Sequence, residues 1–198
     1  MSDVTVVVPH LPSRGGYLAQ ALQSVRRQTV PVADVVVEPD LSMEGAWVTR
    51  NRGMLKVDTS WTAFLDDDDQ LLPHHVELLT HYAYEFDLDF CWGWYQVFGE
   101  AGVDPMPENR GKVWDPDSPH CFPITVLVKT EFLHSAYAHM GGFQPDPEEL
   151  GSWDVQDLPV WYDIVKRQGA KHMAFPEATW RWRFHGNHSS GLPLPWLW

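Results

Sequence analysis

The first 85 residues alternate between short apolar runs and longer segments with helical spacing of their apolar positions. Three runs have the length and the β-branched or aromatic content of buried strands: Val4–Val8, Val35–Val37 and Trp61–Leu65. Two amphipathic segments separate them, one after the loop at 11–16 and one that begins at Gly45. This alternation predicts right-handed βαβ units and a parallel sheet.

The second half of the chain has a less regular pattern. After the third strand we expect helices at His74–Tyr84, Glu131–His139 and Val160–Gln168 and strands at Asp89–Phe98, Ile124–Val128, His172–Phe175 and Thr179–His185. No internal repeat or linker interrupts this order. The sequence therefore predicts one α/β domain with a mixed, mainly parallel sheet flanked by helices.

Polar residues gather where the predicted parallel strands end. Pro9-His10 closes the first strand, Glu38 and Asp40 follow the second, and the four aspartates Asp66–Asp69 follow the third. The carboxyl ends of parallel strands meet at one edge of the sheet, where ligands bind. Four adjacent carboxylates repel one another unless a cation shares the site, and oxygen clusters suit Mg²⁺ or Mn²⁺. A solvated acidic turn is the alternative interpretation of the same run.

Composition and charge narrow the class of protein. The formal net charge of −13 argues against a general nucleic-acid-binding surface, because phosphate contacts need Lys and Arg, although a local basic groove stays compatible with it. We expect no membrane segment and no signal peptide, since no long apolar run and no basic-then-apolar leader is present. Cys91 and Cys121 lack metal-ligand spacing, so we expect free thiols and a cytoplasmic location.

Six motifs, taken together and in order, resemble the family 2 glycosyltransferases of Rossmann-like GT-A fold. They are the Val-Val-Val-Pro run ending at Pro9, Arg50-Asn51-Arg52-Gly53, the Phe-Leu-Asp-Asp-Asp-Asp run at 64–69, Gly141-Gly142-Phe143, the segment Asp157–Lys171 and the closing Arg183-Phe184-His185. The resemblance spans Val4 to about Ser190. It implies a nucleotide-sugar-binding half at 1–98 and an acceptor and catalytic half at 99–198.

The resemblance also implies a reaction. It is the metal-dependent, inverting transfer of a sugar from a nucleotide-diphosphate sugar, with a UDP-sugar favoured, to an acceptor hydroxyl. The cofactor would be Mn²⁺ or Mg²⁺. The acceptor would be a saccharide, a lipid, a protein or a modified nucleobase.

By this resemblance Asp66 and Asp68 form the Asp-x-Asp pair that holds the cation against the diphosphate. Asp68 is the expected direct ligand and Asp66 lies nearer the ribose or sugar, while Asp67 and Asp69 orient ligand waters or face solvent. The run of four leaves this register open by one residue. His185 stands where many GT-A enzymes bring a histidine to the metal. The adjacent Arg181 and Arg183 either face the diphosphate or flank a strand.

The same resemblance places the donor nucleoside against Pro9, with its neighbour His10, and against an acidic residue after the second strand. Glu38 and Asp40 are both candidates for that acidic residue, and either could instead be a turn former. Arg14 and Arg50 are the cations available to phosphate or sugar oxygens, with an ordinary surface charge as the alternative.

Two candidates concern the acceptor side and one the helix that carries Arg50. By the same resemblance, the Trp161–Lys166 segment aligns with the family's Trp-containing helix and makes Asp157 the expected general base, with Asp154 as the competitor. Asp157 is equally a natural helix N-cap. Asn51 matches the Arg-Asn pair of the family, and helix packing is an equally compatible role for it.

Three rival interpretations stay open. A nucleotidyltransferase shares the sheet and the acidic metal site, but its triphosphate needs a Gly-rich basic loop, and residues 10–16 have only a weak form of one. A non-catalytic nucleotide-sugar-binding module would have lost the Asp pair or the base. A glycosyltransferase acting on modified DNA bases is disfavoured by the net charge.

Overall fold

The computed structural model describes residues 2–99, 125–144 and 158–184. In chain order its elements are β1 (Val4–His10), a 3-10 turn (Pro12–Arg14), α1 (Gly15–Arg26), β2 (Asp34–Pro39), α2 (Ala46–Met54), β3 (Trp61–Phe64), β4 (Gln70–Leu71), α3 (His75–Glu85), β5 (Phe90–Gly99), β6 (Leu127–Lys129), α4 (Thr130–Met140), α5 (Leu158–Tyr162), a π-helical turn (Asp163–Arg167) and β7 (His172–Phe184). The described strands form one seven-stranded sheet in the order β2-β1-β3-β6-β5-β7-β4.

The sheet is mixed, as expected. β1 pairs in parallel with both β2 and β3, so that Val7 lies between Val36 and Phe64. β6 pairs antiparallel with β3 and with β5, whereas β7 pairs in parallel with β5 and antiparallel with β4. All described strands belong to this one sheet, which confirms an α/β class and a single domain.

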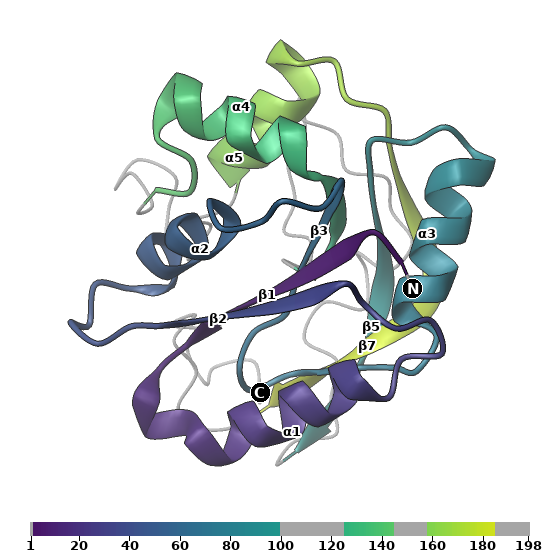
Figure 1. The fold of residues 1–198 in the computed structure, drawn as a ribbon. Helices are drawn as coiled ribbons and strands as arrows, with labels where there is room; N and C mark the ends of the chain where they lie inside the picture. The colour runs from purple at the N-terminus through teal and green to yellow at the C-terminus, as the bar shows by residue number, and fades with distance from the viewer. Residues whose placement is uncertain (1, 100–124, 145–157, 185–198) are drawn as a thin grey trace, which may run out of the picture.

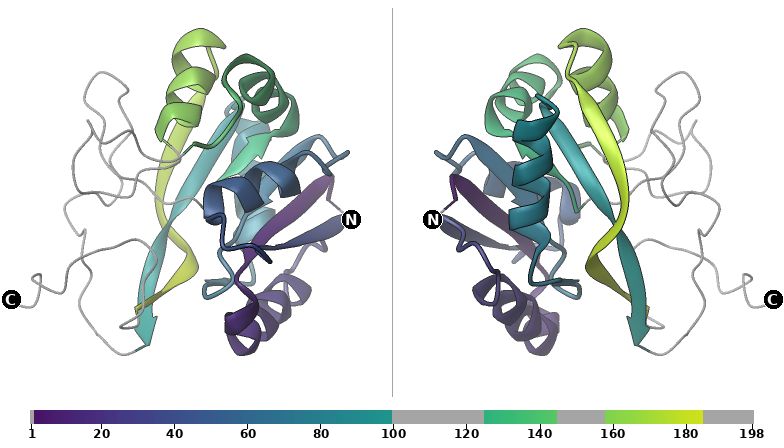
Figure 2. Two further views of the ribbon diagram at one scale, coloured as in Figure 1. Left: turned by 90° about the vertical axis from the view of Figure 1, so that its left-hand side faces the viewer. Right: turned by 90° about the vertical axis from the view of Figure 1, so that its right-hand side faces the viewer.

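Helices cover both faces of the sheet (Figures 1 and 2). Helices α1 and α3 bury their apolar residues against one face, and α2, α4 and α5 bury theirs against the other. Within β1, Val4, Val6 and Val8 belong to the first cluster, and Val7 packs in the second with Met54 of α2. Burial on both faces explains why β1 is rich in valine on both of its faces instead of alternating between apolar and polar residues.

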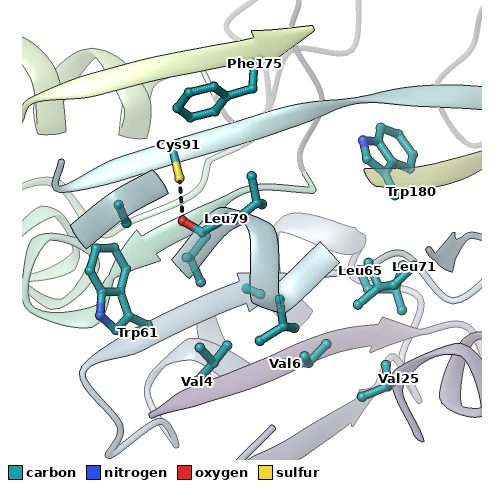
Figure 3. Packing of buried hydrophobic residues seen from close by; sticks show 14 of the residues in the cluster. Val4, Val6, Val25, Trp61, Leu65, Leu71, Leu79, Cys91, Phe175 and Trp180 are labelled. Carbon is teal, nitrogen blue, oxygen red and sulfur yellow. Dashed lines mark hydrogen bonds between the residues drawn. The ribbon is translucent and has the colours of Figure 1, made fainter. Parts of the chain in front are cut away.

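The cluster beneath α1 and α3 contains the buried thiol Cys91 (Figure 3). Its Sγ–H donates to the carbonyl oxygen of Leu79 at 3.5 Å, and the cysteine is free, as expected. Burial raises the pKa of the Cys91 thiol, which keeps it protonated and unreactive. Cys121 lies outside the described residues. The described part of the chain also contains no helix with the length and hydrophobicity of a bilayer span.

Two strands differ from expectation. β7 is one strand where the sequence pattern predicts two, because Pro176 coincides with a shift in register between β7 and β5: Ala174 pairs with Trp92, and Ala178 pairs with Trp94. The proline interrupts the pattern without ending the strand, as at a bulge. β4 was not predicted, since its two residues are too few to show a period.

His75, at the start of α3, gives stability a pH dependence. Its side chain is fully buried, and burial lowers the pKa of His75 to about 3. In the unfolded chain the imidazole titrates near 6.5, so between these values the unfolded state binds more protons and stability falls as pH falls. From pH 7.5 to 5 this group alone should remove about 2 kcal/mol from the free energy of unfolding.

Urea denaturation of the wild type and of His75→Leu at both pH values measures this contribution. The difference in stability between the two proteins should change by about 2 kcal/mol in favour of the variant at pH 5. Carboxylates with raised pKa, such as Asp67 and Asp69, shift stability in the opposite direction in both proteins and cancel in the comparison. Equal pH dependence of both proteins would show that His75 does not titrate as described.

Candidate functional site

The carboxyl ends of β1, β2 and β3 meet at one edge of the sheet and border a cavity of about 270 Å³. Its lining comes from the ends of these strands, the start of α2 and the end of β7: Pro9, His10, Leu11, Arg14, Asp40, Met43, Gly45, Ala46, Thr49, Arg50, Asp66, Asp67, Asp68 and Trp182. The sheet therefore brings together eight of the residues that the sequence marks as candidates. Glu38 and Asn51 do not line the cavity.

Asp67 is tied into the cavity wall. The Leu11 N–H donates to its Oδ2 at 2.8 Å, and His10 Nδ1 lies 2.9 Å from the same oxygen. Burial raises the pKa of Asp67 above its ordinary value, although the bonds from His10 and Leu11 act against this rise. Asp67 thus joins the end of β3 to the end of β1.

Asp66 and Asp68 each form an ion pair at the cavity. Arg14 Nη1 donates to Asp68 Oδ2 at 2.7 Å, and Arg50 Nη2 donates to Asp66 Oδ1 at 2.8 Å. The Asp68 side chain is 13% exposed and that of Asp66 is 32% exposed. Such charge-assisted bonds are stronger than neutral ones. The cavity therefore presents two short carboxylate–guanidinium pairs from three different segments, and Arg14 Nη1 also lies 3.4 Å from Asp67 Oδ1.

Asp69, the last of the four aspartates, is buried immediately before β4 and does not line the cavity. Its Oδ1 accepts the main-chain N–H of Arg183 at 2.7 Å. Burial raises the pKa of Asp69 well above its ordinary value, and repulsion from Asp68 and Asp66 adds to the rise. The four-residue run thus divides into two side chains with short arginine bonds at the cavity, one held in the cavity wall and one buried before β4.

Arg183 holds the aspartate turn from the end of β7. Its Nε–H donates to the carbonyl oxygen of Asp68 at 2.7 Å, and its Nη2 donates to Gln20 of α1 at 2.9 Å. The guanidinium lies 4.5 Å from the ring centroid of Tyr17 and 4.3 Å from that of Phe98. Such contacts between guanidinium groups and rings are stabilising. Arg183 therefore fixes the backbone of the Asp turn, and the described geometry shows no role for it at the cavity surface.

The two acidic residues after β2 have different surroundings. Asp40 lines the cavity, and its two carboxylate oxygens accept the N–H groups of Glu44 and Gly45 at 2.8 Å each. Burial acts to raise the pKa of Asp40, but these two bonds lower it below its usual value. Glu38 is buried beside the cavity and pairs with Lys56. Of the two, only Asp40 reaches the cavity, and it also shapes the turn.

Two large lining residues carry no signal that the sequence analysis used. Met43 follows β2 with a left-handed backbone (φ 57°) and is 77% exposed. Trp182 comes from β7, which pairs with β4 directly after the aspartate run, and no local pattern predicts that long-range pairing. An apolar surface is thus added to the polar wall of the cavity.

Asn51 joins α2 to the turn that follows α4. Its Nδ2–H₂ donates to the carbonyl oxygens of Gly141 (3.2 Å) and Phe143 (2.7 Å), and its Oδ1 accepts the Phe143 N–H (2.9 Å). Gly142 has φ 76°, and a Cβ on it would lie 2.4 Å from Asn51 Oδ1, so only glycine fits beside this side chain. The geometry supports the helix-packing role of Asn51.

Replacing Asn51 by alanine should lower the free energy of unfolding by about 2–4 kcal/mol. The truncation leaves a buried main-chain N–H and two carbonyl groups without their side-chain partner. Arg52→Ala, on the same helix but in a half-exposed ion pair with Glu44, should cost no more than about 0.5–1 kcal/mol. Denaturant unfolding of both variants measures these effects, and an Asn51 variant as stable as the Arg52 variant would contradict the structural role.

The donor set fits a divalent cation in part. Among residues 2–99, 125–144 and 158–184 there is no group of three or more His, Cys, Asp or Glu side chains placed to hold a metal ion. Asp66 and Asp68 nevertheless open onto one cavity and offer the hard oxygen ligands that Mg²⁺ and Mn²⁺ take, with phosphate and water completing such shells. His185, Asp154 and Asp157 lie outside the described residues.

Comparisons with known proteins agree with this fold. The structure of Staphylococcus aureus TarS 1-349 in complex with UDP-GlcNAc superposes with a TM-score of 0.72 at 15% identity, over 96% of this chain and 61% of that chain. TarS 1-349 alone gives a TM-score of 0.68 at 18% identity, over 90% and 59%. At these identities the likeness shows a shared fold, and it confirms the expected GT-A architecture.

Sequence comparison identifies the family. The succinoglycan biosynthesis protein ExoW of Rhizobium meliloti (strain 1021) is 29% identical over 52% of this chain and 43% of that protein. The chain therefore spans less than half the length of this curated relative. The family described as "Glycosyl transferase family 2" matches residues 44–144, just over half of the chain. The chain belongs to glycosyl transferase family 2.

Proposed function

We propose that this chain transfers a sugar from a nucleotide-diphosphate sugar to an acceptor hydroxyl, with the donor bound in the cavity at the ends of β1–β3. The observation that carries the proposal is the convergence of Asp66 and Asp68, each paired with an arginine, on one cavity in a chain of this family. A cavity at this edge of a parallel sheet is the usual place for a nucleotide.

The residues at the cavity suit a diphosphate leaving group. As the bond to the sugar breaks, negative charge grows on the diphosphate, and a bound Mn²⁺ or Mg²⁺ would supply neutralising charge there. Asp66 and Asp68 would hold that ion, with His185 as a further ligand. Arg14 and Arg50 provide guanidinium groups within the same cavity that can bind phosphate oxygens.

The nucleoside would lie against the ends of β1 and β2. Pro9 and His10 border the cavity there, and Asp40 holds the turn that carries Met43 over it. Donor binding then belongs mainly to residues 1–98, with Trp182 and His185 contributing from the second half, and acceptor binding belongs to residues 99–198.

Transfer with inversion needs a base that takes the proton of the acceptor hydroxyl as its oxygen attacks the anomeric carbon. Asp157 is the residue we assign to this role, with Asp154 as the alternative. A positioned carboxylate contributes about 10²–10⁴-fold to such a step. This assignment rests on the motif register, because both residues lie outside the described part of the chain.

The comparisons suggest which substrates to test first. TarS was crystallised with UDP-GlcNAc, so UDP-sugars are the first donors to try. ExoW is named for succinoglycan biosynthesis, which favours a saccharide acceptor over a protein or a modified nucleobase. A net charge of −13 also disfavours DNA as the acceptor. A cytoplasmic location stays a prediction from cysteine usage.

A thermal-shift screen of nucleotide sugars, with Mn²⁺ and with EDTA, tests the proposal. Donor at about 100 times its Kd should add about 2.7 kcal/mol of stability, a rise in Tm of about 5–10 °C, only when the metal is present. No response to any nucleotide sugar would overturn the proposal. Stabilisation without turnover of any acceptor would instead identify a non-catalytic binding module.

A further inference from the structure

Asp68, the expected metal ligand of the proposed function, already has a cationic partner. Arg14 Nη1 lies 2.7 Å from Asp68 Oδ2 and 3.4 Å from Asp67 Oδ1, and all three residues line the cavity. A carboxylate oxygen that accepts a short guanidinium bond offers less electron density to a metal ion. Arg14 and a divalent cation therefore compete for the same carboxylate.

We propose that Arg14 couples metal binding to donor binding by exchanging Asp68 for the diphosphate of the donor. The inference rests on the proposed function and adds to it a role for Arg14. When a divalent ion takes Asp68, the Arg14 guanidinium becomes available to phosphate oxygens, which it can bind as it binds carboxylate. Metal binding thereby makes Arg14 available to the diphosphate, and diphosphate binding draws Arg14 away from the metal ligand Asp68.

The surroundings of Asp68 allow this exchange without movement of the backbone. The Asp68 carbonyl oxygen is held by Arg183 Nε at 2.7 Å, and the next residue, Asp69, accepts the Arg183 main-chain N–H at 2.7 Å. On the other side Asp67 is held by the Leu11 N–H. The turn is thus fixed at both ends, so that exchange requires only side-chain rotation of Arg14 and Asp68.

The net charge at the cavity favours binding of the metal ion and the diphosphate together over binding of either one alone. Four carboxylates and two guanidinium groups line it, which leaves an excess of negative charge. A diphosphate without a metal ion meets this excess and is repelled. A metal ion without a diphosphate must displace Arg14 from Asp68. When both ligands are bound, the metal ion pairs with Asp68 and Arg14 pairs with the diphosphate. By thermodynamic linkage, each ligand then raises the affinity for the other by the same factor.

The second pair, Arg50 and Asp66, is less suited to this exchange. The Arg50 side chain is 8% exposed, whereas the Asp66 side chain is 32% exposed. A cation can therefore approach Asp66 without breaking its bond to Arg50. At the other pair the Asp68 side chain is only 13% exposed, so Arg14 must move away before a cation can bind Asp68.

Mn²⁺ binding measured by electron paramagnetic resonance, and UDP binding measured by calorimetry with saturating Mn²⁺, test the inference on the full chain. Arg14→Gln should bind Mn²⁺ alone about 10-fold more tightly than the wild type, and UDP about 10-fold more weakly. Arg14→Lys keeps the charge and should change both affinities in the same directions by about 3-fold. Arg26→Gln removes one charge from the exposed end of α1 and should change neither.

Tighter Mn²⁺ binding together with weaker UDP binding would exclude a merely structural role for Arg14, because a distorted site would bind both ligands more weakly. If wild type binds UDP with Mn²⁺ but neither Arg14 variant binds Mn²⁺ more tightly, the coupling role is wrong and the proposed function stands. If no nucleotide binds while the Arg14 variants still bind Mn²⁺ more tightly, the competition for Asp68 stands and the donor assignment fails. Absence of Mn²⁺ binding by every protein would overturn the inference.

Discussion

Asp68→Asn is expected to reduce the affinity for UDP in the presence of Mn²⁺ by about 100-fold or more. The amide keeps the size of the side chain but removes the negative charge and one strong oxygen ligand. It also leaves Arg14, which lies 2.7 Å from Asp68 Oδ2, without its closest carboxylate. The loss should vanish when binding is compared in EDTA, since the metal then contributes to neither protein.

Calorimetric titration of UDP into both proteins, with Mn²⁺ and with EDTA, measures this effect. Asp58→Asn, at an exposed aspartate outside the cavity lining, is the matched control and should bind UDP as the wild type does. If the Asp68 variant binds UDP in Mn²⁺ as tightly as the wild type does, the metal ligand is another of the four aspartates. Asp66→Asn would then be the variant with the large loss.

Asp157→Asn should lower kcat about 1,000-fold while it leaves UDP affinity within about 2-fold of the wild type. An amide cannot accept the proton of the attacking hydroxyl, but donor binding does not involve that proton. Release of UDP from UDP-GlcNAc in the presence of saccharide acceptors measures turnover. Asp154→Asn, three residues away, should keep wild-type turnover, and the reverse pattern would make Asp154 the base.

The fold follows from the sequence to the extent that its elements are long and regular. Val4–Val8 is valine at every position except Thr5 because helices cover both faces of β1, and that pattern alone indicates a central parallel strand. β4 has two residues, and β7 passes through Pro176 at a register shift, so neither has a local pattern that matches its final form.

The different positions and partners of the side chains of Asp66–Asp69 could not be predicted from a run of four identical residues. It depends on partners far along the chain: His10 and Leu11 hold Asp67, and Arg183 holds Asp69. The sheet order that brings Arg183 to the turn also brings Trp182 to the cavity. Residue type and position along a strand predict the site's location, and long-range contacts decide which carboxylates face it.

Asn51 illustrates a different limit. The Arg-Asn pair predicts two neighbouring polar residues of one helix, without indicating that they turn to different sides. Arg50 reaches Asp66 at the cavity, whereas Asn51 bonds to Gly141 and Phe143 about 90 residues later in the chain. The sequence separation hides the second partner.

A crystal structure of the chain with UDP and Mn²⁺ tests the central claim most directly. The account predicts the diphosphate in the cavity between Asp68 and Arg50, the metal ion on the carboxylates of Asp68 and Asp66, and Arg14 turned from Asp68 to a phosphate oxygen. Nucleotide density elsewhere on the molecule, or a metal ion bound without Asp66 or Asp68, would contradict it.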